Sequence, residues 1–395
     1  MSSLRRLVGR FYAYRALSAS GFVMPVLTLY LLAQDVSLAG VGLAGGAFFA
    51  GTLLAEIPTG YVGDRVGRRN SLLLGSLVVA TAHAGFALSS SLPAFVASWG
   101  LWGVGSTFRT GSADAWLYDS LAEADATDAF TRVRGRGFSA YLVTAGVTAL
   151  AGGVLYEVGH SLPFVAAAVT SLLSGLVVLT LPEPAVTAES DRFTLAEARD
   201  ALGTIAGSRS LRRFVLVVAV VRAVPETAEV FVQPVATAAG LRPAALGPLY
   251  CVLMLVAAVG SAAAERTERL GVARWFAVGP LFLAATFALG AVVPAVALPA
   301  FAVSRGVDAL TSTLASSELN DRIVSRGRAT TLSAASLVYS LAFMTARFLG
   351  GSLADRTTPL VALTLFGFGA VAVVAVVGAL GDPFRTESAE TARAD

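Results

Sequence analysis

Apolar stretches of about 20 residues follow one another along the whole 395-residue chain, and they constrain its fold more than any other feature. A helix rises about 1.5 Å per residue, so about 20 apolar residues cross the roughly 30 Å of hydrocarbon in a bilayer. Apolar residues make up 55% of the chain, more than is usual in a soluble domain, and charged residues make up only 14%, which is fewer than usual. The pattern predicts an all-α polytopic membrane protein with about twelve transmembrane helices.

The predicted spans fall into two sets of six, separated by the longest polar segment. The first set is 12–33, 38–62, 71–90, 93–120, 138–158 and 163–181. The second set is 214–238, 244–264, 274–292, 295–319, 330–352 and 359–380. The predicted domains are an N-terminal six-helix half at 1–182, a cytoplasmic linker with an amphipathic helix at 183–213, a C-terminal six-helix half at 214–384 and a tail at 385–395.

The basic residues are all arginine, and they gather in alternate loops. Three precede the first predicted span and three follow the second, whereas the other set of loops holds only Arg242 and Arg356. Loops that stay in the cytoplasm carry such an excess of basic residues. We therefore expect a multi-pass protein of the cell (plasma) membrane with both termini cytoplasmic. The formal net charge of +3 does not indicate a nucleic-acid partner.

Short sequence patterns recur in the two halves. Residues 64–67 read Asp-Arg-Val-Gly and residues 268–271 read Glu-Arg-Leu-Gly. Arg-Gly-Arg occurs at 134–136 and again at 326–328, and the glycine pair 152–153 has a counterpart at 350–351. These pairs suggest an internal duplication, which predicts two pseudo-symmetric halves with a site between them.

Residues 60–69, between the second and third predicted spans, read Gly-Tyr-Val-Gly-Asp-Arg-Val-Gly-Arg-Arg. This stretch resembles the signature loop of the major facilitator superfamily of secondary carriers. Residues 56–60 and 113–121 resemble a prokaryotic, drug-efflux-like branch of that superfamily. The resemblance implies alternating access, a small-molecule substrate, a lipid bilayer around the chain and no cofactor, and we expect a monomer.

The resemblance also implies that the signature loop stabilises the outward-facing form. A glycine at position 60 lets two helices approach closely, and the charged side chains can pair across the cytoplasmic seam between the halves. The residues given this role are Gly60, Asp64, Arg65, Gly67, Arg68 and Arg69. The alternative is a short basic loop that only fixes the topology.

Charged residues inside the predicted spans mark a second candidate site. An ionisable side chain at the centre of a span costs at least about 2.5 kcal/mol, so it normally faces a cavity or a partner. In the seventh span Arg222, Glu226, Glu229 and Gln233 follow at helical spacing and share one face. The candidates for proton coupling or for lining the substrate cavity are Arg109, Asp114, Arg222, Glu226, Glu229, Gln233, Arg305, Asp308 and Arg347.

We expect one carboxylate among Glu226, Glu229, Asp114 and Asp308 to take up and release a proton as the halves rock, which makes H⁺ the coupling ion. The alternative is a static ion pair, Arg222 with Glu226 or Arg305 with Asp308, that only locks the bundle. Arg109 lies roughly where proton-coupled carriers of the resembled family have a membrane-buried arginine.

Few fixed charges and the aromatic residues of the spans suit an amphipathic or hydrophobic solute. The resemblance to the drug-efflux-like branch implies efflux, and with H⁺ as the coupling ion we expect proton-coupled efflux by antiport. Uptake or facilitated diffusion of a small polar solute, and a transport-dead receptor on the same fold, stay open. We expect no enzyme activity, because neither a His-Glu-x-x-His helix nor a Gly-x-Ser-x-Gly elbow occurs. One cysteine and two histidines leave too few ligands for a metal site.

Overall fold

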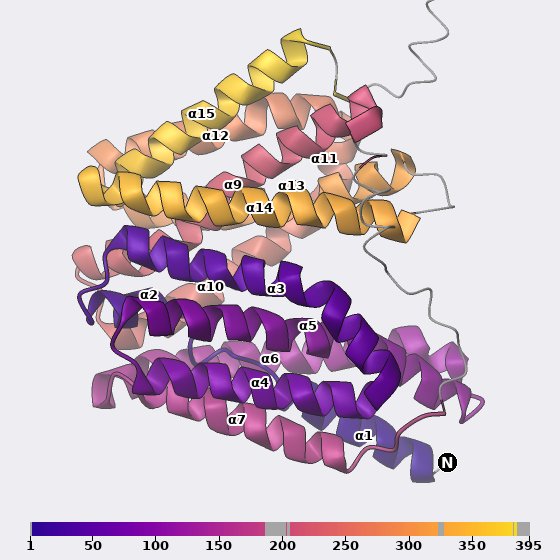
Figure 1. Cartoon of the computed structure of the whole chain (residues 1–395). Coiled ribbons are helices and arrows are strands. Elements are labelled where there is room, and N and C mark those ends of the chain that lie inside the picture. The colour runs from indigo at the N-terminus through magenta and orange to yellow at the C-terminus, as the bar shows by residue number, and fades with distance from the viewer. Residues whose placement is uncertain (1, 186–202, 204–205, 323–327, 382, 385–395) are drawn as a thin grey trace, which may run out of the picture. The chain divides into compact units, whose positions relative to one another are not determined.

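The computed structural model describes residues 2–185, 203, 206–322, 328–381 and 383–384 (Figure 1). For Ser2, Ser3, Ile57, Asp64 and residues 328–330 it describes only the backbone. Within these ranges every regular element is a helix, which confirms the predicted all-α fold. Most of the predicted linker, with its amphipathic helix, and the tail at 385–395 lie outside the described residues.

The helices follow the predicted spans closely in all but the first. Those of the first half are α1 (Ser2–Leu17), α2 (Leu27–Leu32), α3 (Leu38–Val66), α4 (Arg68–Leu88), α5 (Leu92–Ala122), the 3₁₀ turn η1 (Thr127–Ala129), α6 (Phe130–Val158) and α7 (Leu162–Leu179). Those of the second half are α9 (Arg209–Ala238), α10 (Pro243–Ala262), α11 (Ala264–Leu270), α12 (Val272–Val292), α13 (Pro294–Arg322), α14 (Arg328–Arg356) and α15 (Pro359–Ala379).

The first predicted span, 12–33, is not one helix, and that prediction was wrong. A series of turns separates the end of α1 at Leu17 from the start of α2 at Leu27. Pro25 has no backbone N–H with which to continue a helix. Gly21 lies so close to the carbonyl of Ala145 on α6 that a side chain at this position would collide with it. The interruption frees the carbonyl of Ser18 for a partner outside α1.

Eight helices among the described residues are long and apolar enough to cross a membrane: α3, α4, α6 with η1, α7, α10, α12, α14 and α15. The predicted spans on α1–α2, α5, α9 and α13 do not meet that criterion. The first is broken, and the other three carry polar and charged residues that lower their hydropathy. These three helices also carry most of the candidate site.

A stripe of exposed apolar side chains runs along α6. Val143, Val147, Leu150 and Val154 recur at helical spacing, and each is at least 44% exposed. Water does not favour a continuous apolar surface of this kind, whereas lipid does. The chain is therefore a multi-pass membrane protein.

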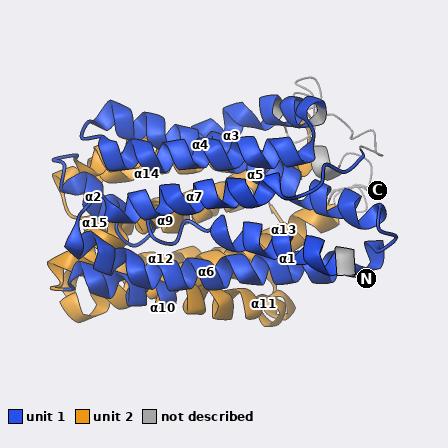
Figure 2. Cartoon of the chain, turned by 90° about the horizontal axis from the view of Figure 1, so that it is seen from below, with its two compact units in different colours: residues 1–36, 47–193, 241–251 blue, residues 37–46, 194–240, 252–395 orange. Residues whose placement is uncertain are grey.

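The chain forms two compact units (Figure 2). Unit 1 comprises residues 1–36, 47–193 and 241–251. Unit 2 comprises residues 37–46, 194–240 and 252–395. Unit 1 thus contains most of the first half of the sequence and a short segment of the second half, and unit 2 contains most of the second half and a short segment of the first. Residues 37–46 begin α3 and residues 241–251 include the start of α10.

In unit 1, aromatic side chains form the core. Near one end Phe11 of α1 stacks on Trp116 of α5, with ring centroids 5.8 Å apart. A second group surrounds Phe86 of α4, which contacts Phe95, Trp99 and other rings from α5 and α7. Aromatic contacts of this kind stabilise a core beyond the area that they bury. They fix α4 between α5 and α7.

In unit 2, α9 is the central helix and packs against α13, α14 and α15. Its face toward these helices is apolar near the N-terminal end, where Phe214, Val218 and Val221 are buried against Phe276 of α12. From Arg222 onward the same helix carries charged side chains. The charged side chains of the candidate site therefore begin where the apolar face of α9 ends.

Candidate functional site

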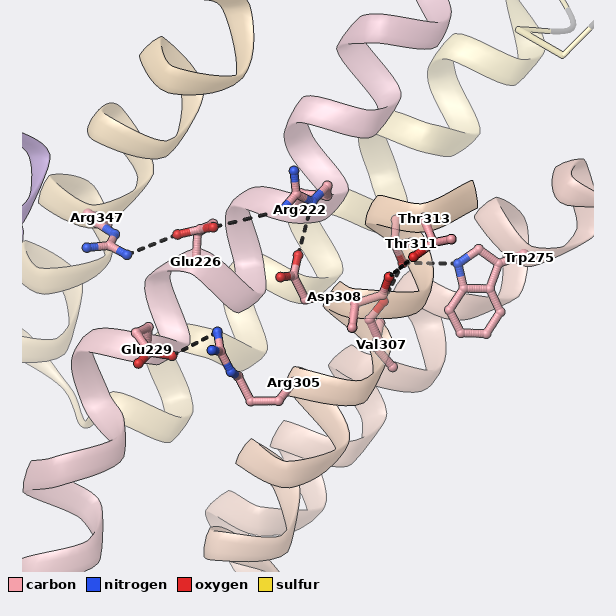
Figure 3. Close-up of polar contacts among 11 residues, drawn as sticks. Arg222, Glu226, Glu229, Trp275, Arg305, Val307, Asp308, Thr311, Thr313 and Arg347 are labelled. Atoms are coloured by element: carbon pink, nitrogen blue, oxygen red, sulfur yellow. Dashed lines mark hydrogen bonds and ion pairs between the residues drawn. The ribbon is translucent and has the colours of Figure 1, made fainter. Parts of the chain in front are cut away.

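The central feature of the site is a chain of ion pairs that joins three helices of unit 2 (Figure 3). Arg222 of α9 donates from Nε to Oδ1 of Asp308 on α13, at 3.0 Å. Its Nη2 lies 3.9 Å from Oε1 of Glu226, one helical turn along α9. Arg347 of α14 donates from Nη2 to the other carboxylate oxygen of Glu226, at 2.9 Å. Four predicted residues therefore form one continuous network.

A second ion pair lies one turn further along α9. Nη1 of Arg305 on α13 lies 3.0 Å from Oε2 of Glu229 (Figure 3). Gln233 follows on the same helix and is buried. The predicted polar stripe on α9 thus faces other helices of its unit, with α13 contributing a partner at two successive turns.

The site balances its charges and is partly screened from solvent. Three arginines meet three carboxylates, and the six side chains are between 12% and 34% exposed. Removing one partner from such a pair leaves an uncompensated charge in a poorly solvated place, which costs more than the pair itself contributes. A proton added to one carboxylate would upset the same balance of charge.

Neighbouring side chains hold the charged groups in place. The guanidinium carbon of Arg222 lies 5.3 Å from the ring centre of Phe343 on α14, within the range of a cation–π contact. Trp275 of α12 donates from Nε1 to the hydroxyl of Thr311 on α13, at 3.0 Å. Thr311 comes one turn after Asp308, so this bond fixes the part of α13 that presents the carboxylate (Figure 3). These supports were not predicted, because an isolated Phe, Trp or Thr in a span gives no signal in the sequence.

Arg109, on α5 in unit 1, has a different environment. It is buried, and its Nη2 donates to the backbone carbonyl of Ser18, at 2.6 Å. That carbonyl is available because the helix is interrupted between α1 and α2. In the part of the chain that the structure describes, we find no carboxylate paired with Arg109. Arg109 therefore holds the broken first span against α5.

Asp114 of α5 belongs to unit 1, as Arg109 does, and its recorded partner is on α6. Its Oδ2 accepts a hydrogen bond from Nε of Arg134 on α6, at 2.8 Å, and both side chains are about half exposed. An exposed pair of this kind contributes little to stability and leaves the carboxylate solvated. Of the four predicted proton carriers, Asp114 is the one that the structure does not bring together with a second candidate residue.

The signature loop is held by residues of its own unit. Gly67 has φ +92°, a conformation suited to glycine, and starts α4. The carboxylate of Glu183, just after α7, accepts the backbone N–H of Arg69 at 3.1 Å and caps that helix. Arg68 lies 4.0 Å from Asp119 at the end of α5. Two of the loop's arginines thus have acidic neighbours within unit 1.

The other residues of the loop contribute less in this structure. Arg65 lies over the ring of Tyr61, 4.4 Å from its centre, and is exposed. The side chain of Asp64 lies outside the described part of the structure. A Cβ atom at Gly60 would meet no described atom within 4 Å. The role of the loop in the outward-facing form stays a prediction.

The model of the Major Facilitator Superfamily matches residues 15–339, which cover most of the chain. The protein belongs to this superfamily. Among curated relatives, this major facilitator is 25% identical over 165 residues to "Uncharacterized MFS-type transporter YxaM" of Bacillus subtilis (strain 168). It is 29% identical over 173 residues to "Probable vesicular acetylcholine transporter-B" of Danio rerio. Each match covers 41% of this chain, but only 40% and 34% of the respective relative.

Solved structures support the same fold. The chain resembles a bacterial homologue of the human lysosomal transporter Spinster with a TM-score of 0.74 at 16% identity, covering 96% of this chain and 95% of the other. It resembles the nucleoside transporter NupG with a TM-score of 0.75 at 12% identity, covering 94% of this chain and 98% of the other. The expected major facilitator fold is thereby confirmed. The drug-efflux-like branch stays a prediction.

Proposed function

We propose that this major facilitator is a secondary active transporter that moves a small amphipathic or hydrophobic solute out of the cell in exchange for protons. Both termini are cytoplasmic in this proposal, and the protein works in the cell membrane by alternating access between its two six-helix halves, 1–182 and 214–384. The family to which the chain belongs supports the transport class, and the arginine distribution supports the topology.

The observation that carries the coupling proposal is the network of α9, α13 and α14. Glu226 shares its carboxylate between Arg347 and Arg222, and Glu229 faces Arg305. When a proton neutralises either carboxylate, an arginine loses a partner, and the hold between the two helices that the pair joins is weakened. A network of this design couples proton binding to helix movement. Asp308, held by Arg222, is the third candidate.

Transport by reconstituted proteoliposomes tests the proposal. A panel of amphipathic dyes, drugs and sugars is loaded with and without an imposed pH gradient. We expect gradient-dependent movement of amphipathic compounds by the wild type. The variants Glu226→Gln and Glu229→Gln mimic protonated carboxylates, and we expect at least one of them to move solute at a rate independent of the gradient. Glu265→Gln is the matched control, because Glu265 is exposed and pairs with Arg269 outside the network.

Unchanged gradient dependence in both α9 variants would remove these residues from coupling and leave the network as a static lock. Accumulation of sugars instead of amphipathic compounds would favour the second candidate function, uptake of a small polar solute. The charged groups of unit 2 give that candidate its support, since a polar solute needs polar partners.

A further inference from the structure

Two carboxylates outside the charged network hold the starts of two other helices. In unit 2, Asp355 near the end of α14 accepts hydrogen bonds from the backbone N–H groups of Leu38 and Ala39, both at 2.9 Å. These N–H groups belong to the first turn of α3, where no helical carbonyl is available to them. Asp355 therefore caps a helix that begins 317 residues earlier in the chain.

In unit 1 the same arrangement recurs with other residues. Glu157 near the end of α6 accepts a hydrogen bond from the backbone N–H of Ala244, at 3.1 Å, in the first turn of α10. Its second oxygen accepts one from Nη2 of Arg242, at 2.8 Å. Glu157 thus caps α10 as Asp355 caps α3. In both cases a helix of one sequence half is capped by a carboxylate of the other half.

The two caps are related residue by residue. A constant shift of 198 residues relates α6 to α14, through the pairs Ala149 and Arg347, Gly153 and Gly351, and Glu157 and Asp355. A constant shift of 205 residues relates α3 to α10, through the pairs Leu38 and Pro243, Ala39 and Ala244, and Gly42 and Gly247.

The backbone contacts beside the caps obey the same shifts. Gly351 lies against the carbonyl of Leu38, and Gly153 against that of Pro243. Gly42 lies against the carbonyl of Arg347, and Gly247 against that of Ala149. At each of these four places an added Cβ would collide with backbone, so the helices touch directly.

One turn further from each cap, Cys251 of α10 is 3.7 Å from the carbonyl of Gly146 on α6. The corresponding Gly46 of α3 lies against Met344 of α14. The duplication seen weakly in the sequence therefore survives as two equivalent seams, α3 with α14 and α6 with α10.

We propose that Glu157 and Asp355 are a duplicated pair of positioning residues that keep these seams closed at the external side of the membrane. This inference rests on the alternating access and the topology of the proposed function. In that topology α3 and α10 begin outside the cell, and α6 and α14 end there. To admit external water or solute, each seam must lose its carboxylate caps, because the capped N–H groups and the carboxylate belong to helices of different halves.

Thiol labelling of the full-length chain tests this proposal without any solute. Cys251 is the only cysteine in the sequence and lies in the α6–α10 seam, so it reports on that seam. A Cys251→Ser, Gly46→Cys chain reports on the α3–α14 seam at the corresponding position. Met344, whose side chain is flexible, is the neighbour that Gly46→Cys would meet. A membrane-impermeant maleimide is added to whole cells, and the labelling rate is measured.

We expect Glu157→Ala to raise the labelling rate of Cys251, and Asp355→Ala that of the cysteine at position 46, by about threefold to tenfold, the factor that one or two hydrogen bonds are worth. Glu157→Gln and Asp355→Asn keep one acceptor oxygen, so their increase should be smaller, and they serve if an alanine variant does not fold. Glu265→Ala removes an exposed carboxylate outside both seams and should change neither rate.

Labelling rates equal to wild type in all four seam variants, with unchanged thermal stability, would overturn the proposal. The proposal would also be overturned if Glu265→Ala raised both labelling rates as much as the seam variants do, because the effect would then not be specific to the caps. The labelling rate does not depend on whether transport is coupled to protons. If the seam variants raise the labelling rate but the protein moves no solute, the caps are supported and the proposed function is contradicted. Normal proton-driven transport with unresponsive seams would contradict the caps and support the proposed function.

Discussion

At the residue scale, the chemistry of the site depends on which oxygen meets which nitrogen. Arg222 uses Nε for Asp308 and Nη2 for Glu226, while Arg347 takes the remaining oxygen of Glu226. A guanidinium offers several donors in a fixed plane, so one arginine can join two carboxylates of different helices. A lysine at position 222 would offer a single point charge and lose one of these partners.

Gly67 allows a prediction about the signature loop at the same scale. Its φ of +92° and ψ of 159° fall in a region open almost only to glycine, and an added Cβ would lie 2.6 Å from the Glu183 carboxylate. We expect Gly67→Ala to destabilise the protein by about 1 to 3 kcal/mol, measured as a lower midpoint of thermal unfolding in detergent. Gly60→Ala is the control in the same motif. It should be neutral or slightly stabilising, because its Cβ meets no described atom and the position is helical. Equal midpoints for the two variants would contradict the assigned strain.

At the element scale, α9 is the helix that the site depends on. It contains Pro225 and Pro234, each of which removes a backbone hydrogen bond of the helix, beside the charged stripe. Partners for this stripe come from α13 and α14. The helix is therefore held at these levels by side-chain ion pairs in addition to apolar packing, and protonation can weaken this hold.

A double-mutant cycle measures how strongly α9 and α13 are joined. We expect Arg222→Gln and Asp308→Asn each to lower stability, and the double variant to lose less than their sum, with a coupling of about 1 to 3 kcal/mol. The reason is that each single change strands a partly buried charge. The exposed pair Glu265 and Arg269 on α11 serves as the comparison, with an expected coupling below about 0.5 kcal/mol. Additive losses at Arg222 and Asp308 would mean that solvent screens the pair.

At the scale of the whole molecule, the charge balance of the site determines how the membrane potential would act on a transport cycle. Three arginines and three carboxylates cancel, so a bound proton gives the network one net positive charge. If that proton crosses with the conformational change while a neutral solute moves the other way, one charge crosses per cycle. A charge crossing the membrane gains or loses about 2.3 kcal/mol per 100 mV.

Transport of a neutral solute should therefore respond to voltage. We expect a potassium diffusion potential, imposed on proteoliposomes without a pH gradient, to drive solute movement, and reversal of its sign to reverse the direction. At least one of Glu226→Gln and Glu229→Gln should reduce this response, since each variant removes one of the two carboxylates on α9. Movement of a neutral solute that is indifferent to voltage would exclude a cycle with one net charge.

The sequence by itself determined the membrane class, the ends of most helices and the face of α9 that bears Arg222, Glu226 and Glu229. These features follow from hydropathy and helical periodicity, which act over a few turns of chain. The sequence likewise indicated the signature loop and a duplicated chain, because both appear as short runs of letters.

Only the tertiary structure decided which charges meet. Arg222 and Asp308 are 86 residues apart, and Glu226 and Arg347 are 121 apart, and no local pattern encodes such a distance. The break between α1 and α2 was decided by contact as well, since Gly21 lies against α6. The partner of Asp114 was likewise decided by packing, because Arg134 on α6 is its neighbour in space. The caps at Glu157 and Asp355 became visible only when helices from opposite halves were packed together, because an acidic residue at a helix end gives no signal of the helix that it will cap.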